Sequence, residues 1–83
     1  LKDNVETISD ALDKVMNLRG VEFDYKANGK HQIGVVAEEV EKVFGCVVDE
    51  TNGIKSVAYQ NLVAVLIEAV KDLKNEIDEL RGV

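Results

Sequence analysis

A seven-residue repeat of apolar residues runs through the last quarter of the sequence and restricts what the chain can fold into. The a positions are Val63, Val70 and Ile77, and the d positions are Tyr59, Leu66, Leu73 and Leu80. No Gly or Pro interrupts this stretch before Gly82, and most of its residues favour helix. The pattern predicts a helix over 59–81. Since a lone helix cannot bury such a stripe, the stripe must pack on the rest of the chain or on copies of itself.

The residues beside the stripe favour association between copies. Leu62, Ile67 and Ala69 widen it to the g and e positions, so this half of the helix can contact its own chain and another subunit. Glu76 at g precedes Arg81 at e by five residues, the spacing of an interchain ion pair in a parallel coiled coil. The alternative is an amphipathic helix packed within a monomer. We expect a parallel homo-oligomer; the β-branched a residues favour two strands, but so short a seam specifies the number weakly.

Size and charge restrict the partners. The 83 residues are near the lower limit for a self-sufficient core, and a single cysteine excludes an internal disulfide and fits a reducing compartment. Oligomerisation is therefore the most available source of further burial.

The net charge of −6 argues against nucleic acid or an anionic membrane as partner. The sequence shows neither a signal peptide nor a transmembrane run. Because it begins with Leu, we expect the chain to be part of a longer polypeptide.

The N-terminal quarter predicts a helix. Asp3 and Glu6 have the spacing of a capping box, although Thr7 or Ser9 could instead cap a helix that begins near Ser9. Gly20 is expected to end it. The apolar residues at helical spacing, which we expect to face inward, are Val5, Ile8, Leu12, Val15 and Met16.

The middle of the chain predicts two hairpins separated by a short helix. Residues 21–26 alternate apolar and polar, Asn28-Gly29 is a strong turn signal, and residues 32–36 would return, with Ile33 and Val35 on one face. Gly34 inside that strand indicates a bulge or a close backbone approach. Residues 37–44 predict a helix with Val40, Val43 and Phe44 inward, ended by Gly45. Residues 46–48 and 54–58 predict strands around an Asn52-Gly53 turn. The fold class is α+β, as a single domain over 1–83.

The side chains that could carry chemistry favour structural roles. His31 lies beside a turn without Cys or His at metal-ligand spacing, which predicts a solvated residue. Cys46 follows a Gly in an apolar run, which predicts a buried structural thiol rather than a nucleophile. Glu38, Glu39 and Glu41 are expected on the solvated face of the short helix. We expect no metal and no cofactor.

One pattern resembles a catalytic dyad. Ser9 precedes Lys14 by five residues, and a Ser–Lys pair can perform nucleophilic catalysis. On a helix these positions lie about 140° apart, so the side chains would not meet. We therefore expect Ser9 to be a capping or surface residue and Lys14 to be solvated.

Several stretches together resemble the endosialidase-type intramolecular chaperone, a domain at the C-terminus of phage tailspikes and tail fibres. A related self-cleaving domain occurs in myelin regulatory factor. The resemblance covers nearly the whole chain in order, and the series is more specific than any one stretch. The matching segments are Leu1–Val5, Ala11–Val15, Leu18–Tyr25, Ile33–Val40, Val57–Leu62 and Leu66–Leu73.

The resemblance implies a homotrimer that holds an upstream fibre of the same polypeptide in register while it folds. The family is released by a Ser–Lys dyad written Ser-Asp-x-x-x-Lys. Lys2 matches the dyad lysine, since it precedes Asn4-Val5 as the family lysine precedes Asn-Ile. The matching serine would lie five residues before Lys2, outside this sequence, so this chain alone is expected to be inactive. Two departures are Glu38 in place of Gln, and Gly45 in place of Pro.

The resemblance therefore favours a trimer where the heptad alone leaned towards a dimer. We expect a viral assembly chaperone in the host cytoplasm, or on the virion tail if it is retained. The alternatives are a self-processing peptidase in which cleavage is the main role, and a permanently attached trimerisation module. The expected seam is Tyr59, Val63, Leu66, Val70, Leu73, Ile77 and Leu80.

Overall fold

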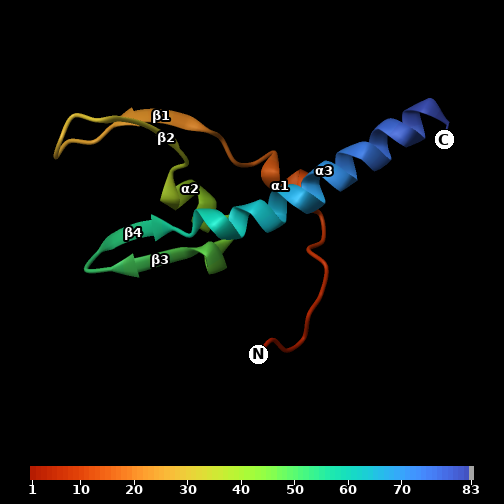
Figure 1. Ribbon diagram of the computed structural model, residues 1–83, viewed down its shortest axis with the longest axis horizontal. Coiled ribbons are helices and arrows are strands. Elements are labelled where there is room, and N and C mark those ends of the chain that lie inside the picture. The colour runs from red at the N-terminus through yellow and green to blue at the C-terminus, as the bar shows by residue number, and fades with distance from the viewer. Residues whose placement is uncertain (83) are drawn as a thin grey trace.

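The long C-terminal helix forms one side of the molecule, and every other element lies along it or at its N-terminal end. The computed structural model describes residues 1–82. In chain order the elements are α1 (Ala11–Val15), β1 (Val21–Asp24), β2 (His31–Gly34), α2 (Ala37–Glu41), a 3₁₀ helix (Gly45–Val47), β3 (Val48–Thr51), β4 (Ile54–Val57) and α3 (Tyr59–Arg81). The two hairpins lie at the N-terminal end of α3, and its C-terminal half extends beyond α1 (Figure 1). The predicted α+β class and the predicted long helix are confirmed.

The N-terminal helix begins later than the capping box predicts. Residues 1–10 have no regular structure, and α1 covers only Ala11–Val15, so the prediction of a start at Asp3 is wrong and the later start is closer. Asp10, at the N-cap, has φ of 54° and makes no side-chain cap. The Leu12 amide instead donates to Asp72 Oδ2 of α3, at 3.2 Å. The cap therefore comes from a residue 60 positions away, which no local pattern could reveal.

The later start also changes which side chains face inward. Val5 and Met16 are exposed, contrary to the expectation, whereas Ile8 and Val15 pack against the core. The helix ends at Val15, five residues before the predicted stop at Gly20, and Met16 is its C-cap. Ala11 is fully buried, with a relative exposure of 0%.

Both predicted hairpins form, as two separate two-stranded antiparallel sheets. β3 pairs with β4 across Asn52-Gly53, where both residues have positive φ, as a tight type I′ turn requires. The β1–β2 loop is longer, because the ladder stops at Asp24 opposite His31 and the Gly29 amide donates to the Tyr25 carbonyl. Both strands of this first hairpin end earlier than predicted. Residues 45–47 form a 3₁₀ helix, so the predicted strand start at Cys46 moves to Val48.

Gly34 allows the first hairpin to approach α3. A Cβ placed on Gly34 would lie 2.6 Å from Tyr59 Oη and 3.3 Å from Phe23 Cε1. The Tyr59 hydroxyl accepts a hydrogen bond from the Val35 amide at 3.3 Å. The close backbone approach predicted at Gly34 is therefore confirmed, and the phenol of Tyr59 is its partner.

The core is small and lies between α2, the 3₁₀ helix and α3. Its buried members are Val40, Phe44, Val47 and Val65. As predicted, Val40 and Phe44 face inward, and Val43 is partly buried against them. The α2 helix ends at Glu41, and the Phe44 amide donates to the Val40 carbonyl to continue the turn.

Two ion pairs attach α2 to its neighbours, which corrects the expectation that its carboxylates are only solvated. Arg19 binds Glu39 through both carboxylate oxygens, with Nη2 to Oε2 at 2.8 Å, and these hydrogen bonds hold the pKa of Glu39 below its usual range. Lys55 of β4 binds Glu41 at 2.7 Å, which raises the pKa of the lysine. α2 is thus tied to the loop after α1 and to the second hairpin.

The Asp72 cap yields a first prediction. We expect Asp72→Ala to lower the free energy of unfolding by about 0.5–2 kcal/mol, the usual range for removing a cap acceptor. Asp72→Asn should retain most of the stability, because its amide oxygen still accepts from Leu12. Thermal unfolding at fixed protein concentration measures both, with Glu79→Ala as a control that removes an exposed carboxylate from the same helix. Equal effects of Asp72→Ala and Glu79→Ala would contradict the cap.

The contact between Gly34 and Tyr59 yields a second prediction. Gly34→Ala should destabilise the fold by about 1 kcal/mol, because the new methyl displaces the hydroxyl and breaks its hydrogen bond to Val35. In a Tyr59→Phe background the same methyl meets ring carbon at an ordinary distance, so Gly34→Ala should then cost less. A double-mutant cycle on chemical denaturation measures this coupling. Additive effects would show that the two residues are not in contact.

Candidate functional site: the exposed face of the C-terminal helix

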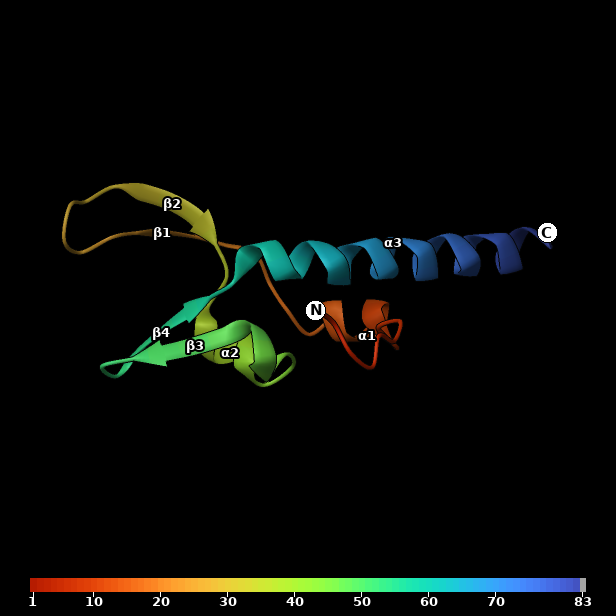
Figure 2. The ribbon, with the colours of Figure 1, turned by 60° about the horizontal axis from the view of Figure 1, so that its bottom comes forward.

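The predicted seam residues form one continuous apolar stripe on α3, and it faces solvent. Each of them is between 38% and 88% exposed. Figure 2 shows α1 against one side of α3, while no other element among residues 1–82 covers the opposite side. The stripe comprises Tyr59, Val63, Leu66, Val70, Leu73, Ile77 and Leu80. The chain therefore does not bury this stripe itself, which argues against the monomer alternative.

A second apolar face of the same helix packs against the chain's own fold. Val65 and Ala69 are buried, and Leu62 is partly buried against the core. Ala69, at a g position, was expected to widen the stripe, but Val65 lies at c and was not recognised. The sequence contained a signal for the burial of Val65, because an apolar residue at c beside apolar g positions indicates a second apolar face turned away from the seam. Ile67, on the e side, stays exposed.

The C-terminal half of α3 is amphipathic and charged on its flanks. Lys74 forms an ion pair with Asp78, one helical turn later in its own chain. Glu76 and Arg81 are exposed on opposite sides of the stripe. Its first turn contacts α1 through Asp72, whose carboxylate accepts a hydrogen bond from the Leu12 amide. The remaining turns extend past α1 in Figures 1 and 2, and their apolar residues Leu73, Ile77 and Leu80 are exposed.

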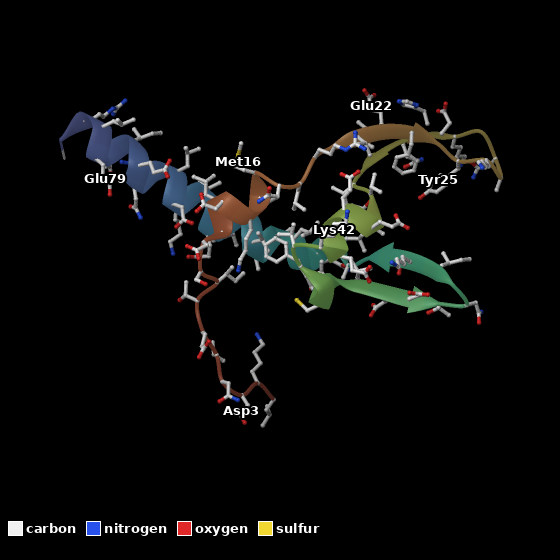
Figure 3. All side chains as sticks on the ribbon, turned by 180° about the vertical axis from the view of Figure 1, so that it is seen from behind. Asp3, Met16, Glu22, Tyr25, Lys42 and Glu79 are labelled. Atoms are coloured by element: carbon white, nitrogen blue, oxygen red, sulfur yellow. The ribbon has the colours of Figure 1, made fainter. Side chains whose placement is uncertain are left out.

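Lys2 lies in the extended N-terminal segment and is exposed. The neighbouring Asp3 marks this segment at a distance from the helices and hairpins (Figure 3). The structure brings no serine hydroxyl to Lys2 in residues 1–82. The predicted dyad lysine is thus accessible and unconstrained by the fold.

Ser9 and Lys14 line the same surface pocket, of about 460 Å³, but no hydrogen bond joins them among the described residues. Ser9 precedes α1, so the reason is its place before the helix rather than the angular offset that we expected. Lys14 Nζ lies 5.8 Å from the centre of the Phe44 ring, a cation–π distance, and the side chain is partly buried. The expectation of a solvated Lys14 is therefore wrong.

Cys46 is exposed, which corrects the expectation of a buried thiol. It is the central residue of the 3₁₀ helix, where Val47 rather than Cys46 turns into the core. The error follows from reading this segment as a strand, since the 3₁₀ geometry changes which side chain faces inward.

His31 lies on the outer face of the first hairpin between two carboxylates. Its Nδ1 is 2.8 Å from Asp24 Oδ1 and its Nε2 is 3.0 Å from Glu22 Oε1. These hydrogen bonds, first to Glu22 and then to Asp24, raise the pKa of His31. The ring is exposed, as predicted, but it is paired rather than merely solvated. Figure 3 shows Glu22 and Tyr25 on opposite faces of this hairpin.

Two further properties bear on the possible chemistry of residues 1–82. No group of three or more His, Cys, Asp or Glu side chains in this range could hold a metal ion. Among the helices of this range, none combines the length and the apolar character needed to span a membrane.

Comparisons with known proteins agree with the resemblance seen in the sequence. A family model described as chaperone of endosialidase matches residues 1–49. Two curated relatives are the long tail fiber protein Gp37 of Enterobacteria phage K3 and that of Enterobacteria phage T2. Each is 38% identical over 93 aligned residues, which cover 99% of this chain and 7% of the relative. The chain thus spans a small fraction of the length of these relatives. Because the family model matches more than half of the chain, this protein belongs to the chaperone of endosialidase family.

Proposed function

We propose that this chain is an assembly chaperone for a phage tail fibre, and that it acts by trimerising through α3 while the upstream part of the same polypeptide folds. The observation that carries the proposal is the continuous stripe of exposed apolar residues on α3, which residues 1–82 leave open to solvent. The family and the tail-fibre relatives supply the context of fibre assembly. A stable trimer of this domain would hold three fibre chains in register.

The physical benefit is a high effective concentration. Long β-rich fibres depend on contacts between residues far apart or on different chains, and such contacts form slowly. A trimeric tether makes the pairing of three chains intramolecular, which raises their effective concentration without any new contact in the fibre. The exposed β edges of a partly folded fibre are also aggregation sites, so faster pairing protects them.

The chemistry of the stripe suits a tight trimer. Fully burying a Val, Leu or Ile side chain contributes about 1.5–3 kcal/mol of favourable free energy relative to leaving it exposed. The same seam residues, on three parallel helices, would meet in layers around one axis. Glu76 and Arg81 flank the last of these layers and would pair between neighbouring chains, which favours the parallel arrangement.

Release by self-cleavage is the second part of the proposal, and Lys2 supports it. The resemblance matches this lysine to the family's dyad lysine, and Lys2 is exposed on the extended N-terminal segment. In the proposed reaction the Lys2 amine accepts the proton of a serine hydroxyl placed five residues upstream, and the serine oxygen attacks a backbone carbonyl to form an ester. The C–N bond of that peptide breaks, and its nitrogen leaves as an amine with the proton returned from Lys2. Water then hydrolyses the ester and restores the serine hydroxyl. A retained trimerisation module is the alternative if no cleavage takes place.

The seam yields a third prediction. Leu73→Asp should convert the trimer to monomer at micromolar concentration, because three carboxylates would otherwise meet in one apolar layer. Asn75→Asp adds the same charge on the far side of the helix and should remain trimeric. Light scattering over a dilution series measures both masses, and circular dichroism confirms that both variants fold. If Leu73→Asp stayed trimeric, the assignment of the seam would be wrong.

A fourth prediction concerns cleavage. When the natural upstream residues are attached, mass spectrometry should detect a new N-terminus near the start of this chain. Lys2→Ala should slow the appearance of this product by about 10²-fold or more, the usual contribution of a general base. Lys14→Ala, which alters the lysine of the other Ser-Asp-x-x-x-Lys pattern, should cleave normally. Undiminished cleavage by Lys2→Ala would remove the dyad hypothesis but leave the assembly role intact.

A further inference from the structure

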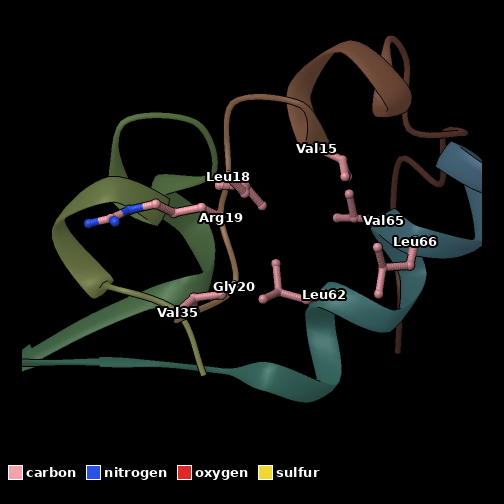
Figure 4. Close-up of a pocket in the computed structure, with 8 residues that line it drawn as sticks. All are labelled: Val15, Leu18, Arg19, Gly20, Val35, Leu62, Val65 and Leu66. Carbon is pink, nitrogen blue, oxygen red and sulfur yellow. The ribbon is translucent and has the colours of Figure 1, made fainter. Parts of the chain in front are cut away.

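An apolar pocket lies directly beside the stripe, on the side of α3 that carries α1. It has a volume of about 200 Å³ and is lined mainly by aliphatic side chains. Figure 4 shows these side chains converging on the pocket from three segments: Val15 and Leu18 from α1 and the turn after it, Val35 from the residue after β2, and Leu62, Val65 and Leu66 from α3.

The charged residue at the rim does not fill this pocket. The Arg19 guanidinium is directed away from it in Figure 4, towards Glu39, with which it forms a two-oxygen ion pair. The pocket therefore presents an apolar interior with no polar side chain of its own to satisfy. An engineered apolar cavity of about 150 Å³ is enough to hold benzene, so this one can admit an aliphatic side chain.

A complementary side chain projects from the other side of the same helix. Ile67 lies at an e position, on the flank of the stripe away from α1, and 54% of it is exposed. Leu62, which lines the pocket, lies at a g position. In a parallel coiled coil, the g residue of one helix meets the e residue that lies five positions later in the neighbouring helix. Five positions after Leu62 is Ile67.

We propose that Ile67 of one subunit inserts into the pocket between α1 and α3 of the next subunit. This docking rests on the trimer of the proposed function and specifies how each subunit recognises its neighbour. The contact is heterologous, because each subunit offers a side chain on one flank and a pocket on the other. Three such contacts close a ring around the threefold axis.

The same five-residue spacing from g to e also pairs residues on the charged part of the two flanks. Glu76 would face the neighbour's Arg81, an attractive pair. The flanks thus change from apolar at the globular end to charged at the free end. A shift of one heptad would place Leu62 against Lys74 and leave the pocket unfilled, so the pocket also specifies the register.

Cysteine cross-linking tests the docking directly. We would introduce Ile67→Cys and Leu18→Cys into one chain with Cys46→Ser, which removes the exposed native thiol. A disulfide requires Cα atoms within about 4.4–6.8 Å, so it forms only if Ile67 enters the neighbour's pocket. Mild oxidation should produce a covalent trimer on non-reducing gels. The matched control replaces Ile67→Cys with Ala64→Cys, on the outer side of α3, and should give at most a trace of covalent species.

A second measurement uses milder changes. Ile67→Ala and Leu18→Ala should each raise the concentration at which the trimer dissociates by roughly tenfold or more, since each empties part of one contact. The double variant should dissociate at a lower concentration than the product of the two effects predicts, because the two residues share one contact. Independent effects would overturn the docking.

The outcomes separate this inference from the proposed function. A trimer by light scattering with an efficient cross-link supports the docking. A trimer in which the Ile67 pair cross-links no better than the Ala64 control overturns the docking but keeps the assembly role. A monomer at micromolar concentration overturns both.

Discussion

The packing of α1 on α3 is the contact on which the rest of the structure depends. Ala11 and Ala69 are both buried, and such small side chains let the two helices approach closely. The carboxylate of Asp72 completes the contact by accepting from the Leu12 amide at the first turn of α1. A helix of five residues is too short to be stable alone, so α1 exists because α3 caps it and covers it. This contact uses one apolar face of α3 and directs the other, which carries the heptad stripe, to solvent.

Because one apolar face of α3 packs within the chain and the other is exposed, folding of the subunit is linked to association between subunits. The buried core of one chain is small, consisting of Val40, Phe44, Val47 and Val65, and includes only one aromatic ring. A chain of this size gains limited stability from such a core. Burial of the stripe between copies would remove further apolar surface from water. The stability of the subunit and the affinity of the subunits for one another would then be parts of one equilibrium. Dilution would then weaken the fold as well as the assembly.

The sequence predicted those elements whose signals are local. The heptad pattern located α3, and Asn28-Gly29 and Asn52-Gly53 located both hairpins, because a turn or a periodic stripe depends on adjacent residues. The sequence left two possible starts of α1 open and could not choose between them, since the cap is supplied by Asp72, 60 positions away. The prediction of a buried Cys46 failed because Cys46 lies in a 3₁₀ helix that the sequence did not reveal. The prediction of a solvated Lys14 failed because Lys14 packs over the ring of Phe44, which is distant in sequence. The heptad spacing located the stripe on one face of α3, and the apolar c position of Val65 beside apolar g positions indicated a second, inward face. The pocket beside Val65 could not be predicted, because it depends on the path of α1.

The order of events in assembly follows from the same distinction between local and distant contacts. The hairpins, α2 and α3 are built from neighbouring residues, and such elements form in microseconds, whereas fibre β structure with non-local contacts forms much more slowly. The α1–α3 contact joins residues from the two ends of the described chain. In the proposed function, α3 is therefore available to associate while the fibre is still unfolded. Closing the pocket around the neighbour's Ile67 would then couple completion of α1 to assembly, because Val15 and Leu18 line it. The segment that carries Lys2 leads directly into α1, so assembly and the geometry of the proposed cleavage site would be connected through the first ten residues.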